Sequence, residues 1–473
     1  MLVIDFGNVE GADLLVVPVF ADRVPATQSD LAPDLEALAS LLDVKDFTGK
    51  KGQLLFVPTP SGPPGEVLLV GLGDDVDLER LRRAAGSVAR AASRYESVAT
   101  LLHDVDIDGA SGAVALGSRL GLYEFNEYRS EPKTHDIESI ILVGEGDADE
   151  LAEANAVARG VMFARDLVNR PAEDKAPETI AEIASTLHES IEVTIFDEDD
   201  IAAKGFGGLA GVNAGADRPA RMVLMEYRPE GATATVAFVG KGIVFDSGGL
   251  SIKPAAGMEP MKTDMAGAAA VIAAVRAIAE VGLAVNVIGI TPLTENLSGG
   301  SALKPGDVVK IYNGKTMEIL NTDAEGRIVL ADGLSLATEM GADLIVDIAT
   351  LTGTAKAALG TDIGALFASD DEAAERVLAA AKGAGEKFWQ MPLDKDYRSL
   401  VDSDIADMKN TGGRWGGAIN AALILSEFVD ETPWVHLDVA GPARAEKTEH
   451  YITKGGSGFG VRTLFGIASS LAD

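Results

Sequence analysis

The segment Asn321-Thr-Asp-Ala-Glu-Gly-Arg-Ile328 is the most informative stretch of this sequence, because it places two carboxylates and a guanidinium within a few residues. In an extended conformation, Asp323, Glu325 and Arg327 would alternate with small residues and share one face. Such a face can bind cations and an anion together. An exposed acidic turn with a local ion pair is the structural alternative, and an EF-hand is excluded because its loop needs more carboxylates in a longer fixed pattern.

A second cluster is the glycine-rich segment Val239-Gly-Lys-Gly-Ile-Val-Phe-Asp-Ser-Gly-Gly-Leu-Ser-Ile-Lys-Pro254, which begins where an apolar strand ends. Its glycines allow sharp turns and leave Lys241, Asp246 and Lys253 at the carboxyl end of that strand, where ligands bind in open α/β sheets. A dinucleotide-binding G-x-G-x-x-G motif is excluded because Phe245 stands where a third glycine is needed, and no P-loop motif is present. An ordinary glycine-rich turn is the alternative.

Two further elements connect these clusters. Residues 308–312 and 316–320 flank Asn313-Gly314 and are predicted to form a β-hairpin that leads into the acidic segment. Residues 266–281 have the apolar spacing of a helix, and Asp264 lies directly before it. Asp264 is either a helix cap or a further member of the acidic cluster.

Carboxylates from three separate loops form a set of hard oxygen ligands, Asp246, Asp264, Asp323 and Glu325, of the kind that divalent metals prefer. Their four negative charges would balance two dications. That balance leaves no anion for Lys241, so this lysine would have to bind as a neutral amine. Lysine is a rare metal ligand, and the residues alone do not assign it to the site.

Length and composition limit the remaining classes of protein. A chain of 473 residues with 47% hydrophobic and 24% charged residues is expected to fold as two globular domains. The net charge of -33 would repel nucleic acid and anionic lipid, so neither is an expected partner. The absence of cysteine excludes disulfides and thiolate sites and favours the cytoplasm. The apolar run at residues 14–20 follows acidic residues and resembles a strand instead of a signal peptide.

Hydrophobic periodicity predicts the order of the elements. In the first part of the chain, strands are predicted at residues 14–19, 53–57, 66–70 and 139–143, and helices at residues 77–93 and 110–122. A long helix at residues 147–169 is predicted to bridge two domains. Beyond it, strands are predicted at residues 192–196, 222–227, 236–239, 284–290 and 344–348, and the helix at residues 266–281 should end at Gly282. We therefore expect two α/β domains, residues 1–155 and 156–473.

The acidic segment resembles the signature NTDAEGR of the leucyl aminopeptidase family, which is intact at residues 321–327. Other segments match the family in order and spacing, namely residues 241–246, 251–254, 261–268, 349–353, 434–441 and 455–462. The resemblance covers about residues 164–462 and says little about the first domain. It implies a smaller N-terminal α/β domain and a larger catalytic α/β domain with a mixed central sheet flanked by helices.

The resemblance also implies roles for individual residues. Two divalent metal ions per subunit, zinc or manganese, would be bound by Lys241, Asp246, Asp264, Asp323 and Glu325, with Asp246 and Glu325 bridging them. Lys253 and Arg327 would be catalytic, with a bicarbonate ion held by Arg327 as a proton shuttle. Substrate would be bound by Met261, Thr350, Leu351 and Gly353.

The implied function is metal-assisted removal of amino-terminal residues, preferably leucine or other apolar residues, from short peptides. The family forms homohexamers. Two alternatives are a scaffold protein that has lost the site and a two-metal phosphatase, although phosphatase sites usually add histidines. The five histidines of this chain have no metal-ligand spacing, and His436 is expected to be a core residue.

Overall fold

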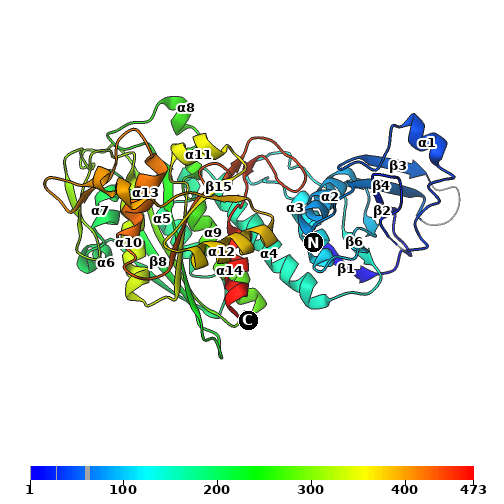
Figure 1. The fold of residues 1–473 in the computed structure, drawn as a ribbon, viewed down its shortest axis with the longest axis horizontal. Coiled ribbons are helices and arrows are strands. Elements are labelled where there is room, and N and C mark those ends of the chain that lie inside the picture. The colour runs from blue at the N-terminus through cyan, green and yellow to red at the C-terminus, as the bar shows by residue number, and fades with distance from the viewer. Residues whose placement is uncertain (1, 28, 59–63, 473) are drawn as a thin grey trace. The chain divides into compact units, whose positions relative to one another are not determined.

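The computed structural model describes residues 2–27, 29–58 and 64–472. It divides into two compact units, drawn in Figure 1. Unit 1 comprises Met1–Arg159 and Lys447–Lys454, and unit 2 comprises Gly160–Glu446 and Gly455–Asp473. Helix α4 (Ala148–Asn169) runs from unit 1 into unit 2 and corresponds to the long helix predicted from the sequence.

Unit 1 is an α/β domain built on a six-stranded sheet with the strand order β1-β6-β5-β2-β4-β3. Its strands are β1 (Val3–Gly7), β2 (Leu14–Phe20), β3 (Leu54–Pro58), β4 (Glu66–Gly73), β5 (Ser97–Thr100) and β6 (Ser139–Val143), and its helices are α1 (Ala39–Val44), α2 (Leu78–Ala91) and α3 (Ala110–Gly121). Only the edge strand β3 runs antiparallel to its neighbour. The four predicted strands and both predicted helices are confirmed, whereas β1 and the short β5 were not predicted.

Unit 2 contains a larger mixed sheet, which confirms the expected fold class. Its strands are β7 (Ile191–Phe196), β8 (Arg221–Tyr227), β9 (Thr235–Gly240), β10 (Gly242–Asp246), β11 (Asn286–Asn296), β14 (Leu344–Ala349), β15 (Gly364–Ala368), β16 (Phe388–Gln390) and β18 (Trp434–Asp438). The order is β16-β15-β18-β14-β9-β11-β8-β7, with β10 pairing to the far end of β11. Strands β18, β14, β9 and β11 are parallel and form the middle of the sheet.

Two small sheets and several helices complete unit 2. The small sheets are formed by β12 (Val308–Lys310), β13 (Thr316–Glu318) and β17 (Met408–Lys409), and by β19 (Arg444–Ala445) and β20 (Gly455–Gly456). Strands β12 and β13 are the predicted hairpin. The helices are α5 (Pro177–Ala184), α6 (Glu198–Lys204), α7 (Gly207–Asn213), α8 (Ala255–Met258), α9 (Ala266–Val281), α10 (Glu325–Glu339), α11 (Gly353–Leu359), α12 (Asp371–Ala384), α13 (Gly417–Ser426) and α14 (Val461–Ala472), with short 3-10 turns η1 (Ala172–Asp174), η2 (Met261–Thr263) and η3 (Lys395–Val401).

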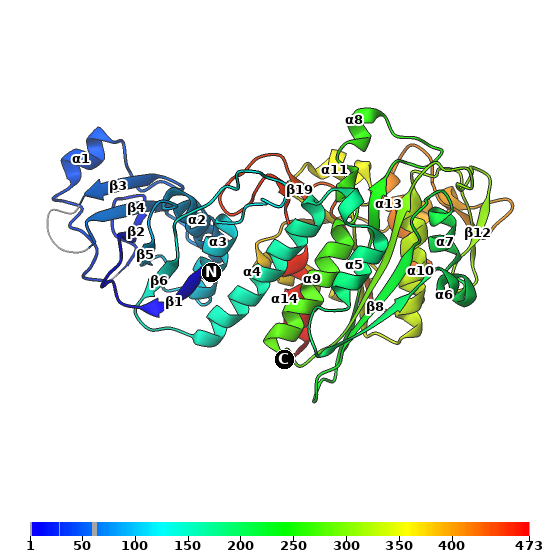
Figure 2. The same ribbon diagram turned by 180° about the vertical axis from the view of Figure 1, so that it is seen from behind.

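Helices cover both faces of the large sheet. Figure 2 shows α9 beside α14, and these two helices pack on each other. A Cβ on Gly289 of β11 would meet Val271 and Val275 of α9, whereas a Cβ on Gly333 of α10 would meet the next strand residue, Ile290. Successive strand residues point to opposite faces, so α9 and α10 enclose the sheet between them.

The end of α9 follows the sequence prediction. Gly282 has a φ of 79° and caps the helix by donating its N–H to the carbonyl of Ile278. This left-handed conformation carries a steric cost for residues with a Cβ, which is why glycine ends the helix here.

The acidic segment does not have the extended conformation in which its charged residues would share one face. Asp323 lies in a turn, and Glu325 is already the first residue of α10, so Glu325 and Arg327 belong to a helical turn. The buried apolar run that follows packs as a helix against the sheet, and a carboxylate at the first helical position is favoured by the unpaired N–H groups there. The common face that an extended segment would have given therefore does not form.

Candidate active site

The site begins at an interruption in the large sheet. Strands β9 and β10 both pair with β11, and Lys241 is the residue between them. Its N–H donates to the carbonyl of Ile348 (3.1 Å) and its carbonyl accepts from the N–H of Ala268 (2.9 Å). These bonds hold the backbone of Lys241 between the end of β14 and the start of α9. A Cβ at position 326 would lie 2.9 Å from the Lys241 ammonium, so Gly326 allows α10 to approach this lysine.

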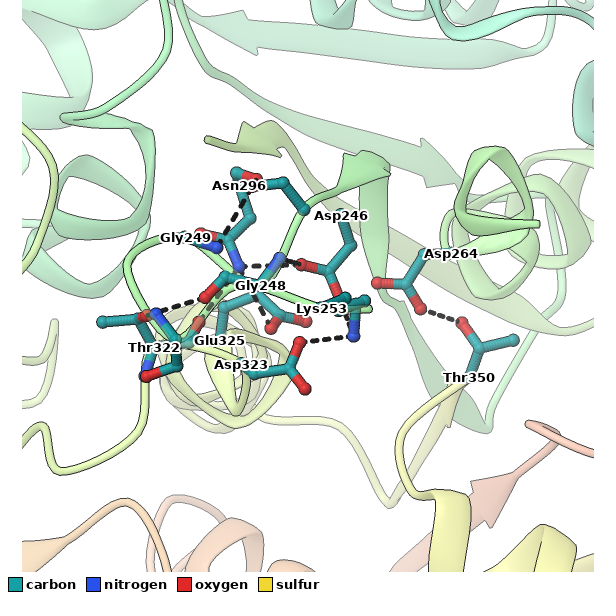
Figure 3. Close-up of polar contacts among 12 residues, drawn as sticks. Asp246, Gly248, Gly249, Lys253, Asp264, Asn296, Thr322, Asp323, Glu325 and Thr350 are labelled. Carbon is teal, nitrogen blue, oxygen red and sulfur yellow. Dashed lines mark hydrogen bonds and ion pairs between the residues drawn. The ribbon is translucent and has the colours of Figure 1, made fainter. Parts of the chain in front are cut away.

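Four carboxylates converge here from separate elements, and two lysines lie among them. The Lys241 Nζ is 2.8 Å from an oxygen of Asp264 and 2.8 Å from an oxygen of Glu325. The Lys253 Nζ is 2.8 Å from Asp246 Oδ2 and also forms an ion pair with Asp323, as Figure 3 shows. Each lysine therefore bridges two carboxylates.

Asn296, at the end of β11, organises the buried side of the cluster. Its side-chain amide donates to Asp246 Oδ1 (2.8 Å), to the carbonyl of Thr322 (3.0 Å) and to Glu325 Oε2 (3.3 Å). The sequence did not indicate this residue. Its only signal is its position at the carboxyl end of a buried strand beside the glycine-rich segment.

The turn of Gly248 and Gly249 joins the glycine-rich loop to the acidic segment. Thr322 Oγ1 donates to the carbonyl of Gly248 (2.7 Å) and accepts from the N–H of Ser251 (2.8 Å), as part of the network in Figure 3. Gly248 has a φ of 86°, and a Cβ there would lie 2.9 Å from Asp323 Oδ1. Glycine is therefore needed for both the backbone conformation and the close approach.

Asp264 is held from its other side. Thr350 Oγ1 donates to Asp264 Oδ1 at 2.7 Å, and the Lys241 ammonium donates to the carbonyl of Thr350 at 3.1 Å. Helix α9 has no side-chain cap, so the capping role that could have explained Asp264 is excluded. Asp264 belongs to the acidic cluster.

Burial and mutual repulsion disturb the titration of the cluster. Burial, together with neighbouring carboxylates, raises the pKa of Asp246 to about 6 and that of Asp264 to about 8. Burial alone would lower the pKa of Lys241, but Asp264, Glu325 and Asp246 outweigh it and raise the pKa above its ordinary value. The carboxylates thus stabilise positive charge at this position.

The donor set of the cluster fits divalent cations. Oxygen atoms of Asp246, Asp323 and Glu325 lie within 4.8 Å of one another. The buried atoms Asp264 Oδ2 and Asp323 Oδ1 each touch a lysine ammonium, yet accept no hydrogen bond of good geometry from any described residue. Buried carboxylate oxygens in a cluster where carboxylates outnumber lysines are suited to metal coordination.

Arg327 lies beside this cluster on the first turn of α10. Its guanidinium donates to the carbonyl of Asn410 at 2.7 Å. Burial lowers the pKa of Arg327 to about 10, opposed by Glu325 and Asp438. Asp438 in turn accepts from the N–H of Leu351 (3.3 Å) and from Thr352 Oγ1 (2.6 Å), and so fixes the loop after β14.

One cavity of about 330 Å³ collects every residue to which the resemblance assigned a role. These residues are Lys241, Asp246, Lys253, Met261, Asp264, Asp323, Glu325, Arg327, Thr350, Leu351 and Gly353. Other lining residues were not singled out from the sequence, namely Pro260, Thr263, Ala324, Gly326, Thr352, Lys356, Ala440, Ala443, Arg444 and Glu446. Most of them lie on the loops next to the recognised segments, but nothing in their residue types marks them as lining.

No histidine lines this cavity. His436 is fully buried in β18, with its Nδ1 2.6 Å from Asp347 Oδ1 of the neighbouring strand. It is the core residue that the sequence indicated.

Two family models match the chain. The catalytic domain of the cytosol aminopeptidase family matches residues 162–465, and the N-terminal domain of the same family matches residues 16–132. The chain belongs to the cytosol aminopeptidase family. It is therefore an enzyme, a hydrolase of the aminopeptidase class, as the resemblance predicted.

Members of the cytosol aminopeptidase family resemble the chain over nearly its whole length. A probable cytosol aminopeptidase of Nostoc punctiforme is 42% identical over 96% of this chain and 95% of its own length, and one from a Geobacter species is 44% identical over 90% of both chains. Among solved structures, the bottromycin maturation enzyme BotP in complex with Mn has a TM-score of 0.89 and 37% identity, covering 98% of this chain and 100% of its own. A mutant of tomato leucine aminopeptidase has a TM-score of 0.89 and 34% identity, covering 99% and 96%.

No helix in the described ranges is both long and apolar enough to cross a lipid bilayer.

Proposed function

We propose that the chain is a two-metal aminopeptidase that releases leucine or another apolar residue from the amino end of short peptides. One observation carries the proposal: residues from distant parts of the sequence, each with a role in the resemblance, line a single cavity of suitable chemistry. We further propose that the domain division at residues 155 and 156 separates this catalytic part from the N-terminal domain.

The metal ligands would be Lys241, Asp246, Asp264, Asp323 and Glu325, and the ions zinc or manganese. Divalent ions supply Lewis-acid catalysis and activate water near neutral pH. The excess of carboxylates over lysines in the cluster supports this assignment, and so does the related BotP structure in complex with Mn. Lys241 would give up its proton and act as a neutral amine ligand.

Lys253 would donate to the oxyanion that develops on the scissile carbonyl. Both lysines line the cavity, but the side chain of Lys253 is 16% exposed and that of Lys241 only 3% exposed. Arg327 would hold a bicarbonate ion that moves protons. Its hydrogen bond to Asn410 leaves further N–H groups of the guanidinium for an anion.

The loop after β14 would bind the substrate backbone through Thr350, Leu351 and Gly353. Met261 would form a wall for the side chain of the first residue. Ala440 and Ala443 also line the cavity, and their apolar character supports a preference for leucine and similar residues.

The assembly would be a cytoplasmic homohexamer, as in the family. Three large apolar side chains of unit 2 support association, because Trp389, Ile405 and Trp415 are 64%, 65% and 73% exposed.

The proposal is tested by removing metal. Protein dialysed against a chelator should lose hydrolysis of leucine amide and regain it with added zinc or manganese, since water activation depends on the ions. N-acetyl-leucine amide, which lacks the free amine, should resist cleavage throughout.

Undiminished hydrolysis by protein shown to be free of metal by elemental analysis would refute the two-metal mechanism. Hydrolysis of 4-nitrophenyl phosphate without hydrolysis of leucine amide would favour the phosphatase instead. An inert protein with normal metal content would favour the scaffold.

A further inference from the structure

Two cations in the cavity wall have no part in the cluster of carboxylates. Lys356 lies on α11 and Arg444 on β19, and both side chains are exposed. Neither side chain forms a hydrogen bond or an ion pair with any residue in the described ranges. Both side chains are therefore free to meet a ligand in the cavity.

The position of Lys356 follows from the helix that carries it. Gly353, a proposed substrate contact, and Lys356 are three residues apart on α11 and share a face. Three residues of helix advance about 4.5 Å, and one residue of an extended peptide advances about 3.3–3.6 Å. A peptide that extends past Gly353 along this face therefore reaches Lys356 within a residue or two.

Arg444 approaches the cavity from a different part of the fold. It follows Ala440 and Ala443, which line the same cavity, on the segment after β18. Glu446 is also exposed and lines the cavity, so one anion lies near the two cations. Lys356 and Arg444 outnumber Glu446, so these exposed lining residues carry a net positive charge, opposite in sign to that of the four carboxylates.

The size of the cavity limits what these cations can meet. A volume of about 330 Å³ is at the lower end of ligand pockets, so a bound peptide has few residues within it. The group of a short peptide that carries negative charge at its far end is its terminal carboxylate.

We propose that Lys356 and Arg444 bind the terminal carboxylate of a di- or tripeptide whose free amine lies at the carboxylate cluster. Arginine offers a fork that matches a carboxylate, and lysine adds a point charge. The inference rests on the proposed aminopeptidase function and narrows its substrates to very short peptides with a free carboxyl end.

The test compares two peptides that differ only at this end. We expect kcat/KM for leucyl-glycine to exceed that for leucyl-glycinamide by about 3- to 10-fold, since exposed ion pairs contribute modest free energies. The difference should lie mainly in KM and should shrink as NaCl is added. In the double variant K356Q/R444Q the two peptides should become equivalent.

Two matched variants control for charge. K382Q removes an exposed lysine of α12 that does not line the cavity, and it should leave the preference intact. E446Q removes the anion near the two cations and should increase the preference.

The outcomes distinguish failure of this inference from failure of the proposed aminopeptidase function. If neither peptide is cleaved, the proposed aminopeptidase function fails. If both peptides are cleaved equally, the inference fails but the proposed aminopeptidase function is supported. The same holds if the double variant still prefers leucyl-glycine over leucyl-glycinamide. The inference also fails if the double substitution impairs only substrates with an acidic first residue, seen as a lower rate for glutamyl-glycinamide and an unchanged rate for glutaminyl-glycinamide.

Discussion

The two lysines of the site, Lys241 and Lys253, differ in how deeply their side chains are buried. Lys241 and Lys253 both lie between two carboxylates and both line the cavity, yet the side chain of Lys241 is 3% exposed and that of Lys253 is 16% exposed. The more exposed Lys253 can reach a substrate more readily than Lys241, which is almost fully covered. Residue type alone does not distinguish a metal ligand from an oxyanion donor here, whereas burial does.

Replacement of Lys253 tests this distinction. Lys253→Ala should lower kcat by about 10²- to 10³-fold, the usual loss for one oxyanion donor. Metal content should remain normal, because the carboxylates provide the coordination. Initial rates on leucine amide together with elemental analysis would measure both, and loss of metal in this variant would show that Lys253 supports the ions instead of the transition state.

Arg327 should behave differently from Lys253. If it holds bicarbonate, Arg327→Ala should retain metal and substrate binding but lose the benefit of that anion as a proton carrier. Rates measured across a bicarbonate titration should rise for the parent and stay flat for the variant. Equal stimulation of both proteins would contradict the assignment.

At the scale of elements, the side chain of Lys175 binds the carboxyl end of α4. The Lys175 ammonium donates to the carbonyls of Leu167 (2.8 Å), Val168 (3.1 Å) and Lys262 (2.6 Å) and is completely buried. Three donors meet three acceptors, which satisfies carbonyls that a helix end leaves unpaired. The contact with Lys262 ties α4 to η2, the turn that contains Met261.

Replacement of Lys175 should therefore destabilise the fold. Lys175→Met keeps the length of the side chain but leaves buried carbonyls without donors, and we expect a loss of about 1–3 kcal/mol in the free energy of unfolding. Urea denaturation would measure it. An unchanged midpoint would mean that water replaces the ammonium.

The difference in the free energy of unfolding between the parent and Lys175→Met should depend on pH. Burial, with smaller effects of Lys262 and Arg170, holds the pKa of Lys175 well below its usual 10.5. A base with a depressed folded pKa contributes stability that is present above 10.5 and is lost as pH falls through the folded pKa. The stability of the parent relative to Lys175→Met should therefore increase as pH is raised from neutral towards 10.5, and a decrease would reject the depressed pKa.

For the whole molecule, the prediction concerns assembly. Sedimentation at micromolar concentration should give a particle of about six chains of 49.1 kDa. The exposed apolar side chains of unit 2 would lose contact with water in such a particle. A monomer under these conditions would contradict the hexamer.

The periodicity of the sequence was sufficient for the strands and helices that it predicted, although most helices of unit 2 were not among them. Strand β6 and helix α9 have the predicted bounds, and Gly282 ends α9 as expected. These features depend on local chemistry, because alternation, helical spacing and glycine conformations are properties of neighbouring residues. The signature at residues 321–327 was likewise enough to name the family.

Tertiary structure decided what local chemistry left open. The residue pattern alone left Asp264 between a helix cap and the acidic cluster, although the resemblance placed it among the metal ligands. The pattern also did not show that α10 begins at Glu325. The cavity wall that contains Lys356 and Arg444 joins segments that only the folded chain brings together. The reason is topological: parallel strands place their carboxyl ends at one edge of the sheet, so loops distant in sequence meet there, and side-chain patterns along the chain carry no record of that meeting.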